Sequence, residues 1–266
     1  MRFEVLHRTV YRYSGPVRLG PHLLRLTPRP GRVAELSHAL TVTPQPVARR
    51  DETDAHGNRV TRLEFAGETR ALILESRFTL RTWAGREAPE GGPVPPLCAV
   101  APEVAAFAAA LGPPGGEPDR FLTALTEALH ARIARQVRPT GAAWPAEVTL
   151  ARGQGACRDL AVLFIAAAAS RGIAARFVSG YQAESERPGG PRHMHAWPEA
   201  LVPGLGWCGY DPTHGCAVGA GHVALAVAPD QAGTMPVEGG FIAGPVTAAM
   251  EVDLRVATAP DGAAPD

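Results

Sequence analysis

Residues 153–164 read GQGACRDLAVLF, and this stretch decides most of the predicted fold. Glycines at positions 153 and 155 let the backbone turn sharply, and the apolar residues after them predict a helix that ends at Gly172. Cys157 therefore lies in the first turn of that helix, where backbone N–H groups are unpaired and the helix dipole is positive. Both effects favour the thiolate, which is the reactive form of cysteine.

A cysteine at this position has two interpretations. It is either a small buried apolar residue, which is the usual place of an unpaired cysteine, or a nucleophile that needs a base nearby. His195 follows Cys157 by 195 − 157 = 38 residues and begins a strand-like segment. Asp211 ends the next strand-like segment, directly before Pro212.

The turn Pro203-Gly204-Leu205-Gly206 joins these two segments, so we expect them to pair as antiparallel neighbours. That pairing brings His195 and Asp211 side by side, and an aspartate so placed orients the imidazole and stabilises its charged form. We predict Cys157 as the nucleophile, His195 as base and acid, and Asp211 as the orienting group. Taken singly, a histidine such as His195 is more often structural, and an aspartate such as Asp211 is more often a solvated turn residue. His193, on the same strand face as His195, is a rival base.

The rest of the chain predicts an α+β architecture. Residues 1–83 are rich in β-forming residues, interrupted by turns such as Ser14-Gly15-Pro16, which predicts an N-terminal β-sandwich or barrel-like domain. Residues 84–100 are expected to form a linker, residues 101–258 a core with helices packed on an antiparallel sheet, and residues 259–266 a frayed tail. In the N-terminal part we expect strands at 9–13, 38–42, 60–65 and 72–80. Three helices are expected next: one at 103–111, one that begins with Asp119 as its cap, and one at 157–172. Strands at 175–181, 196–202, 206–210, 222–227 and 250–257 follow.

Composition excludes several classes of partner. The formal net charge is zero and the pI is about 7.1, so no overall field attracts nucleic acid or an anionic membrane. The N-terminus lacks an apolar signal segment, and the longest apolar run, Leu160 to Ala169, is too short to cross a bilayer. The four cysteines lack the spacing of a disulfide scaffold, so we expect a cytoplasmic protein. All 26 basic residues are arginine, so the chain cannot supply a lysine side chain to a cross-link.

A metal site has little support in the sequence. Cys208, His214, Cys216 and His222 fall close together along the chain, but no Cys-x-x-Cys pair accompanies them. We therefore expect neither a metal nor a cofactor.

Several motifs resemble the core of the bacterial transglutaminase-like family, whose fold is similar to that of papain-like cysteine proteases. The resemblance is carried by residues 153–181, by His195-Ala196-Trp197, by residues 203–207 and by Tyr210-Asp211-Pro212-Thr213. The family has cysteine, histidine and aspartate in this order, which matches Cys157, His195 and Asp211. Residues 11–17, 24–28 and 54–58 resemble pieces of the β-rich domain that precedes this core.

The resemblance implies acyl transfer or hydrolysis of an amide through a thioester, with a protein, a peptide or a small amide as substrate. A second reading is a noncatalytic binding module that keeps the fold. Two departures stand out. Pro198 cannot donate to a sheet and predicts an edge strand or a bulge. Residues 228–231, APDQ, replace the arginine and the aromatic residue that the family pattern has there.

Overall fold

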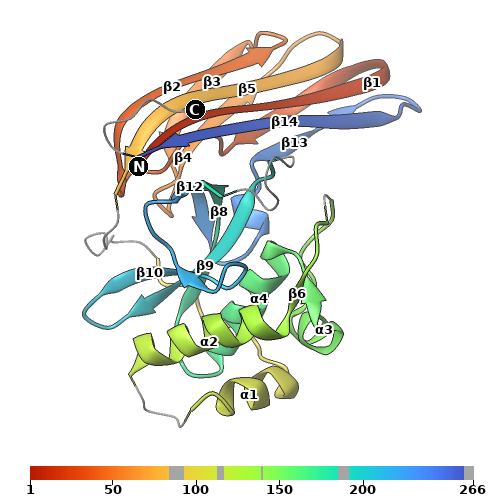
Figure 1. Ribbon diagram of the computed structural model, residues 1–266. Coiled ribbons are helices and arrows are strands. Elements are labelled where there is room, and N and C mark those ends of the chain that lie inside the picture. Colours follow the sequence, from red (N-terminus) through yellow and green to blue (C-terminus); the bar gives the residue numbers. More distant parts are fainter. Residues whose placement is uncertain (84–92, 113–116, 139, 185–191, 261–266) are drawn as a thin grey trace.

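The computed structural model describes residues 1–83, 93–112, 117–138, 140–184 and 192–260. Figure 1 shows three layers: a long curled sheet, a second and smaller sheet beneath it, and a group of helices at the far end. The predicted mixed architecture, with a β-rich N-terminal part and helices packed on an antiparallel sheet, is confirmed.

Seven strands form the curled sheet. Its centre is β1 (Arg2–Leu24), which pairs with β5 (Thr69–Thr82) from Arg2 opposite Arg81 onward. Buried and exposed positions alternate along β5, because successive side chains of a strand point to opposite faces. The other strands are β2 (Val33–Thr43), β3 (Ala48–Thr53), β4 (Arg59–Glu64), β13 (Val237–Ile242) and β14 (Ala248–Ala259), in the order β2-β5-β1-β4-β3 with β13 and β14 on β1.

Two expectations about this sheet differ from the structure. Residues 14–16 form no turn between strands; β1 continues through them, and its register with β5 shifts between Arg12 and Val17. A bulge of this kind accommodates a proline, which has no N–H to donate to the ladder.

The C-terminal strands also belong elsewhere than predicted. β14 pairs with β1 from Tyr13 opposite Ala248 to Arg2 opposite Ala259, so residues 237–259 complete the N-terminal sheet. The prediction assigns residues 237–258 to the core of 101–258 and Ala259 to the tail of 259–266, whereas the structure assigns them to the N-terminal sheet. The sequence could not show this, because a strand's partner in a distant segment leaves no local signal. Of the predicted linker, residues 93–100 have no regular structure and residues 84–92 lie outside the described part of the chain, as do residues 261–266 of the tail.

The second sheet supports the core. Its order is β11-β10-β9-β8-β12, formed by β8 (Ala175–Gln182), β9 (His195–Val202), β10 (Gly206–Asp211), β11 (Cys216–Ala217) and β12 (His222–Ala228). β9 is central, so Pro198 does not mark an edge strand. The paired residues of β9 and β10 run only from Val202 to Glu199, so the ladder stops next to Pro198 and no donor is missing.

The helices cover one face of this sheet (Figure 1). They are α1 (Pro102–Ala109), α2 (Pro118–Arg132), α3 (Ala146–Arg152) and α4 (Cys157–Ala169), with a short parallel pair of β6 (Ala134–Arg135) and β7 (Gln154–Gly155) and a 3₁₀ turn η1 (Ala232–Thr234). The predicted cap at Asp119 is wrong: Glu117 is the N-cap residue of α2, without a side-chain hydrogen bond, and Pro118 takes the first turn, where its missing N–H has no cost. Among the described residues, no helix has the length and apolar character that crossing a bilayer requires.

The two sheets share an apolar interface. Phe3, Val5, Phe78 and Leu80 from the curled sheet pack against Tyr181, Val223 and Leu225 of β8 and β12. Asn58, which is fully buried, adds a polar clamp: its side chain donates to the Val227 carbonyl and accepts from the Val227 N–H, each at 2.8 Å. The N-terminal sheet thereby holds β12 in place, and β12 carries one of the histidines described below.

Candidate active site

Cys157 is the first residue of α4, as the glycine-rich stretch predicted. Gly153, with φ of 61°, ends α3 in the left-handed conformation that glycine adopts without strain, and Ala156 is extended. The chain can therefore turn directly from α3 into α4. The Cys157 side chain is partly exposed, whereas the next two turns of the helix are largely buried.

Asp159 fixes the start of the helix. Its fully buried carboxylate accepts hydrogen bonds from the Ala156 N–H at 2.8 Å, from the Trp144 N–H at 2.7 Å and from Arg138 at 2.6 Å. The guanidinium groups of Arg138 and Arg152 both lie over the Trp144 ring, each 4.4 Å from a ring centroid. This cluster anchors the loop before α3 to the turn that carries Cys157.

His195 and Asp211 meet across the β9–β10 hairpin, as predicted. His195 Nε2 lies 2.8 Å from Asp211 Oδ2, and the two side chains are 2% and 0% exposed. The Cys157 thiol lies close enough to His195 to raise the pKa of its imidazole. Because Nε2 faces the carboxylate, the Nδ1 atom is left for the thiol. The structure thus brings all three predicted residues together.

The charges of this cluster reinforce one another. Burial alone lowers the pKa of His195, but the Asp211 carboxylate raises it by charge and by hydrogen bond, as does Cys157 to a smaller extent, and the outcome is a pKa of about 10. Burial likewise raises the pKa of Asp211, but His195 and two further imidazoles hold it well below its usual range. The arrangement favours an imidazolium at His195 beside the Asp211 carboxylate.

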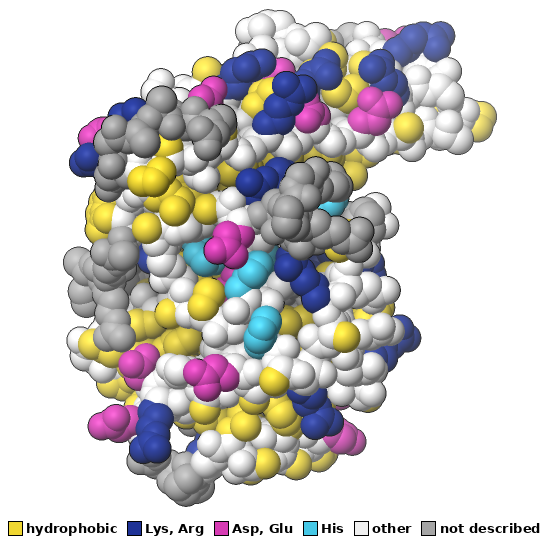
Figure 2. Space-filling model, in the orientation of Figure 1, with side chains coloured by type: hydrophobic (Ala, Val, Ile, Leu, Met, Phe, Trp, Pro, Cys, Tyr) yellow, Lys and Arg dark blue, Asp and Glu magenta, His cyan; other side chains and the backbone are white. Residues whose placement is uncertain are grey.

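Two histidines that the sequence analysis did not assign to this site also contact Asp211. His214 Nδ1 lies 2.8 Å and His222 Nε2 lies 3.0 Å from the same Oδ2 atom. Figure 2 shows histidine side chains gathered between the curled sheet and the helical end. The Thr213-His214-Gly215 turn directly after Asp211 is a local signal for His214, whereas His222 lies at the start of β12 and has no such signal.

The same atoms bear on metal binding. The ligand atoms of His195, Asp211 and His222 lie within 4.8 Å of one another, a spacing that metal sites share. The His195 and His222 nitrogens, however, lie at hydrogen-bond distance from the carboxylate. Of the two thiols in the considered zinc pattern, Cys208 donates weakly to the Gly206 carbonyl at 3.8 Å, and Cys216, which pairs with Asp211 across the β10–β11 ladder, is exposed and does not belong to this group of ligand atoms. The geometry is that of a hydrogen-bond network.

Trp197 closes the site on one side. It is 1% exposed, and its ring centroid lies 5.2 Å from His222 and 5.9 Å from His195. Gly180 makes room for it, because a Cβ at that position would come within 2.8 Å of the indole and 2.1 Å of the Val223 carbonyl. The rival base, His193, is exposed.

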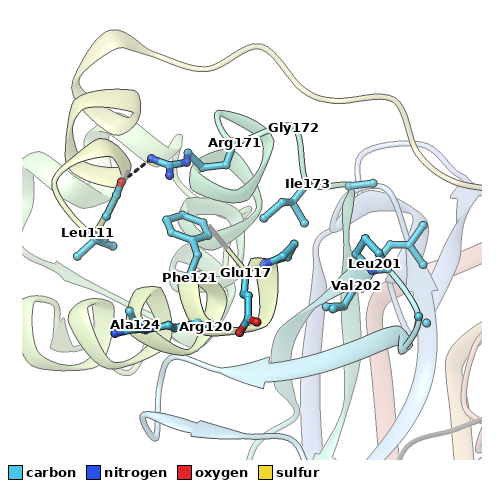
Figure 3. Close-up of a pocket in the computed structure, with 16 residues that line it drawn as sticks. Leu111, Glu117, Arg120, Phe121, Ala124, Arg171, Gly172, Ile173, Leu201 and Val202 are labelled. Carbon is cyan, nitrogen blue, oxygen red and sulfur yellow. Dashed lines mark hydrogen bonds between the residues drawn. The ribbon is translucent and has the colours of Figure 1, made fainter. Parts of the chain in front are cut away.

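The large pocket of the described structure lies away from these residues. A cavity of about 1100 Å³ is bordered by α2, by the residues that follow α4 and by the β9–β10 turn (Figure 3). Arg171 spans it, donating to the Gly112 carbonyl at 3.0 Å and lying 4.9 Å from the Phe121 ring. Its lining contains none of Cys157, His195 and Asp211, because Cys157 begins α4 and this cavity lies beyond the end of that helix.

Known proteins share this sequence and this fold. Residues 3–81 match the bacterial transglutaminase-like N-terminal region, and residues 106–212 match the transglutaminase-like superfamily. Uncharacterized proteins of Mycobacterium bovis and Mycobacterium tuberculosis are each 30% identical over 273 aligned positions, covering 90% of this chain and 87% of theirs. A protein from Cytophaga hutchinsonii, provisionally named a cysteine protease, superposes with a TM-score of 0.72 at 21% identity, over 98% of this chain and 92% of that one. The chain therefore belongs to the bacterial transglutaminase-like family.

Proposed function

We propose that this protein is a cysteine enzyme that transfers or hydrolyses the acyl group of an amide, with Cys157 as nucleophile. The observation that carries the proposal is the chain of contacts from Cys157 at the head of α4, through the buried His195, to the Asp211 carboxylate 2.8 Å away. A cysteine, an imidazole and an orienting acid in contact are what nucleophilic catalysis by a thiol needs. Family membership supports the general kind of enzyme.

The proposed reaction has two halves. The Cys157 thiolate forms a bond to the amide carbonyl carbon, and the backbone N–H at the start of α4 is placed to stabilise the oxyanion. The imidazolium of His195 gives its proton to the leaving nitrogen, so ammonia or an amine departs and a thioester remains. His195 then takes a proton from water or from an incoming amine, which attacks the thioester and releases Cys157.

The nature of the second nucleophile separates the possible activities. Water gives a carboxylate and makes the protein an amidase or protease, whereas an amine gives a new amide and makes it a transamidase. We expect a peptide, a protein or a small amide as substrate, with no cofactor. The cytoplasmic location stays a prediction from the cysteine spacing.

Labelling of individual thiols tests the nucleophile. Wild-type protein and Cys157→Ala are treated with iodoacetamide at pH 6, and each cysteine is followed separately by peptide mass. Cys98 and Cys216 are exposed, and burial raises the pKa of both thiols, with Asp211 adding to the rise at Cys216, so they serve as slow internal controls. We expect Cys157 to react at least about 10-fold faster than either, because only it pairs with an imidazolium.

Product analysis tests the reaction. Glutamine-containing peptides are incubated with a fluorescent primary amine, and released ammonia, new peptide N-termini and incorporated amine are measured. The chain has no lysine, so side-chain amine of the enzyme itself cannot compete. Cys157→Ala should abolish all three products. Undiminished turnover by that variant would contradict Cys157 as the nucleophile. A wild-type protein that forms none of the three products, with a Cys157 no faster than Cys98, would leave the noncatalytic binding module.

A further inference from the structure

Asp211 has more hydrogen-bond donors than orienting one histidine requires. Its Oδ2 atom faces three imidazole nitrogens, those of His195 and His214 at 2.8 Å and that of His222 at 3.0 Å. Its Oδ1 atom accepts the backbone N–H groups of Thr213 at 3.0 Å and His214 at 3.3 Å. The carboxylate is completely buried, so these five donors are its whole described environment in place of water.

The three imidazoles reach Asp211 from separate parts of the chain. His195 begins β9, His214 lies in the turn after β10, and His222 begins β12. Their rings form a cage, with centroids 5.3 Å apart for His195 and His214 and 6.2 Å apart for His195 and His222. Any rotation of the carboxylate away from His195 must therefore break bonds to two other elements.

The remaining ring nitrogen of each extra histidine has a hydrogen-bond partner of its own. The Gly219 backbone N–H points to His222 Nδ1 at 3.4 Å, and an amide N–H can only donate, so Nδ1 accepts and Nε2 carries the hydrogen that Asp211 receives. The amide nitrogen of Gln182 lies 3.5 Å from His214 Nε2, and an amide N–H donated there leaves His214 Nδ1 to donate to Asp211. His222 is then a neutral donor.

We propose that His222, assisted by His214, is a positioning residue that holds the Asp211 carboxylate against His195 as a neutral hydrogen-bond donor. This inference rests on the proposed function, since it assigns these residues to the same thiol–imidazole reaction. A neutral donor fixes the position of Oδ2 without adding a second positive charge beside the imidazolium. It also shares the carboxylate's negative charge, so Asp211 attracts the His195 proton less strongly than a carboxylate with a single partner would.

The charged groups around His222 agree with a neutral ring. Burial lowers its pKa; Asp211 raises it by hydrogen bond and charge, and His195 and Arg32 lower it further. Two thiols lie among the surrounding titratable groups: Cys157 acts on His195, and Cys216 is affected by Asp211 and Glu184. An imidazolium at position 222 would face both Arg32 and His195, so a second cation there is disfavoured.

Paired substitutions test the role of His222. His222→Leu keeps the approximate size and removes the donor, whereas His222→Gln places an amide N–H near the position of Nε2. His214→Leu and His214→Asn form the matching pair, since the asparagine N–H replaces that of Nδ1. For each folded variant we measure the alkylation rate of Cys157 by iodoacetamide from pH 5 to 9 and the titration of His195 by ¹⁵N NMR.

We expect His222→Leu to lower the alkylation rate about 10-fold to 100-fold, the equivalent of one hydrogen bond to a charged group. The His195 titration should move to higher pH, because Asp211 loses a competing donor. His222→Gln should retain the rate within about 3-fold and leave the titration in place. A residue that only supports the fold would change the folded fraction and would not move the titration of His195.

This design distinguishes failure of the inference about His222 from failure of the proposed function. A His222→Leu variant that is folded, reacts at the wild-type rate and keeps the wild-type His195 titration overturns the inference while the proposed function stands. A wild-type Cys157 that is no faster than Cys98 overturns the proposed function, and the His195 titration of the variants still decides whether His222 acts through Asp211.

Discussion

His7 and His195 are equally buried, each 2% exposed, yet their surroundings shift the pKa of the imidazole in opposite directions. His7 belongs to β1 at the seam between the curled sheet and the core, and burial lowers its pKa to about 4. His195 begins β9 in the candidate active site; burial lowers its pKa too, but Asp211 reverses the effect and raises it to about 10. Burial alone makes a histidine neutral, and only a carboxylate makes a buried histidine cationic.

The partners explain the difference. His7 Nδ1 lies 2.7 Å from the Tyr181 hydroxyl, and Nε2 lies 3.2 Å from the Thr9 hydroxyl. Both partners are neutral, and burial raises the pKa of Tyr181, so the phenol stays protonated. At the seam, a neutral imidazole thus has hydrogen-bond partners for both nitrogens and joins β1 to β8. In the candidate active site, the Asp211 carboxylate stabilises a charged imidazole.

Removing the carboxylate breaks this comparison and has the largest expected effect. In Asp211→Asn, His195 stays buried without an anion and should become like His7, with a pKa below the ordinary 6.5. By analogy with the same change in other triads, we expect amide turnover to fall about 10⁴-fold, because the imidazole loses both its tautomer and its charge. Steady-state kinetics and the NMR titration of His195 measure the two effects.

The matched control for that variant is Asp253→Asn, on the exposed face of β14. Its carboxylate pairs with Arg255 at the surface, at 3.1 Å, so both activity and the His195 titration should match wild type. An Asp211→Asn protein that is folded and turns over within 10-fold of wild type would show that the carboxylate does not set the state of His195.

The pH dependence of stability tests the other histidine of the comparison, His7. The folded pKa of His7 is about 4 and its unfolded value is 6.5, so its contribution to stability is complete above pH 6.5 and is lost as the pH falls toward 4. The difference of 2.5 pH units corresponds to about 3 kcal/mol of unfolding free energy. Urea unfolding of wild type and His7→Gln at pH 7, 5.5 and 4 should show a shallower acid loss in the variant. Parallel pH curves would mean that the pKa of His7 is not lowered in the fold.

The sequence could predict the triad because each member has a local signal. Cys157 follows a glycine-rich turn, and His195 and Asp211 flank a hairpin whose turn is visible in the sequence. The β-rich N-terminal part and the helix at Cys157 were likewise within reach of local patterns.

What depends on contacts between distant segments could not be predicted. The pairing of β14 with β1 joins the two ends of the chain, and no periodicity announces which strand a β-segment will choose. The same holds for His222, whose role depends on β12 lying beside β8 and being clamped by Asn58. His7 lies in a segment whose alternation only indicates a strand, because its partner Tyr181 is 174 residues away.

The smallest expected effect comes from giving His7 a carboxylate partner, as His195 has in the candidate active site. In Thr9→Asp a carboxylate replaces the hydroxyl beside His7 Nε2, and an anion at that distance should raise the pKa of His7 by about 1 pH unit or more, removing about 1.4 kcal/mol of the acid loss. Thr9→Asn has nearly the same shape without the charge and is the control. Both variants should be less stable than wild type at pH 7, since Thr9 is buried, so the measurement is the slope of unfolding free energy against pH between 6.5 and 4. A shallower slope in Thr9→Asp than in Thr9→Asn means that a carboxylate partner suffices to charge a buried imidazole in this fold; equal slopes mean that the active site needs its whole cage of donors as well.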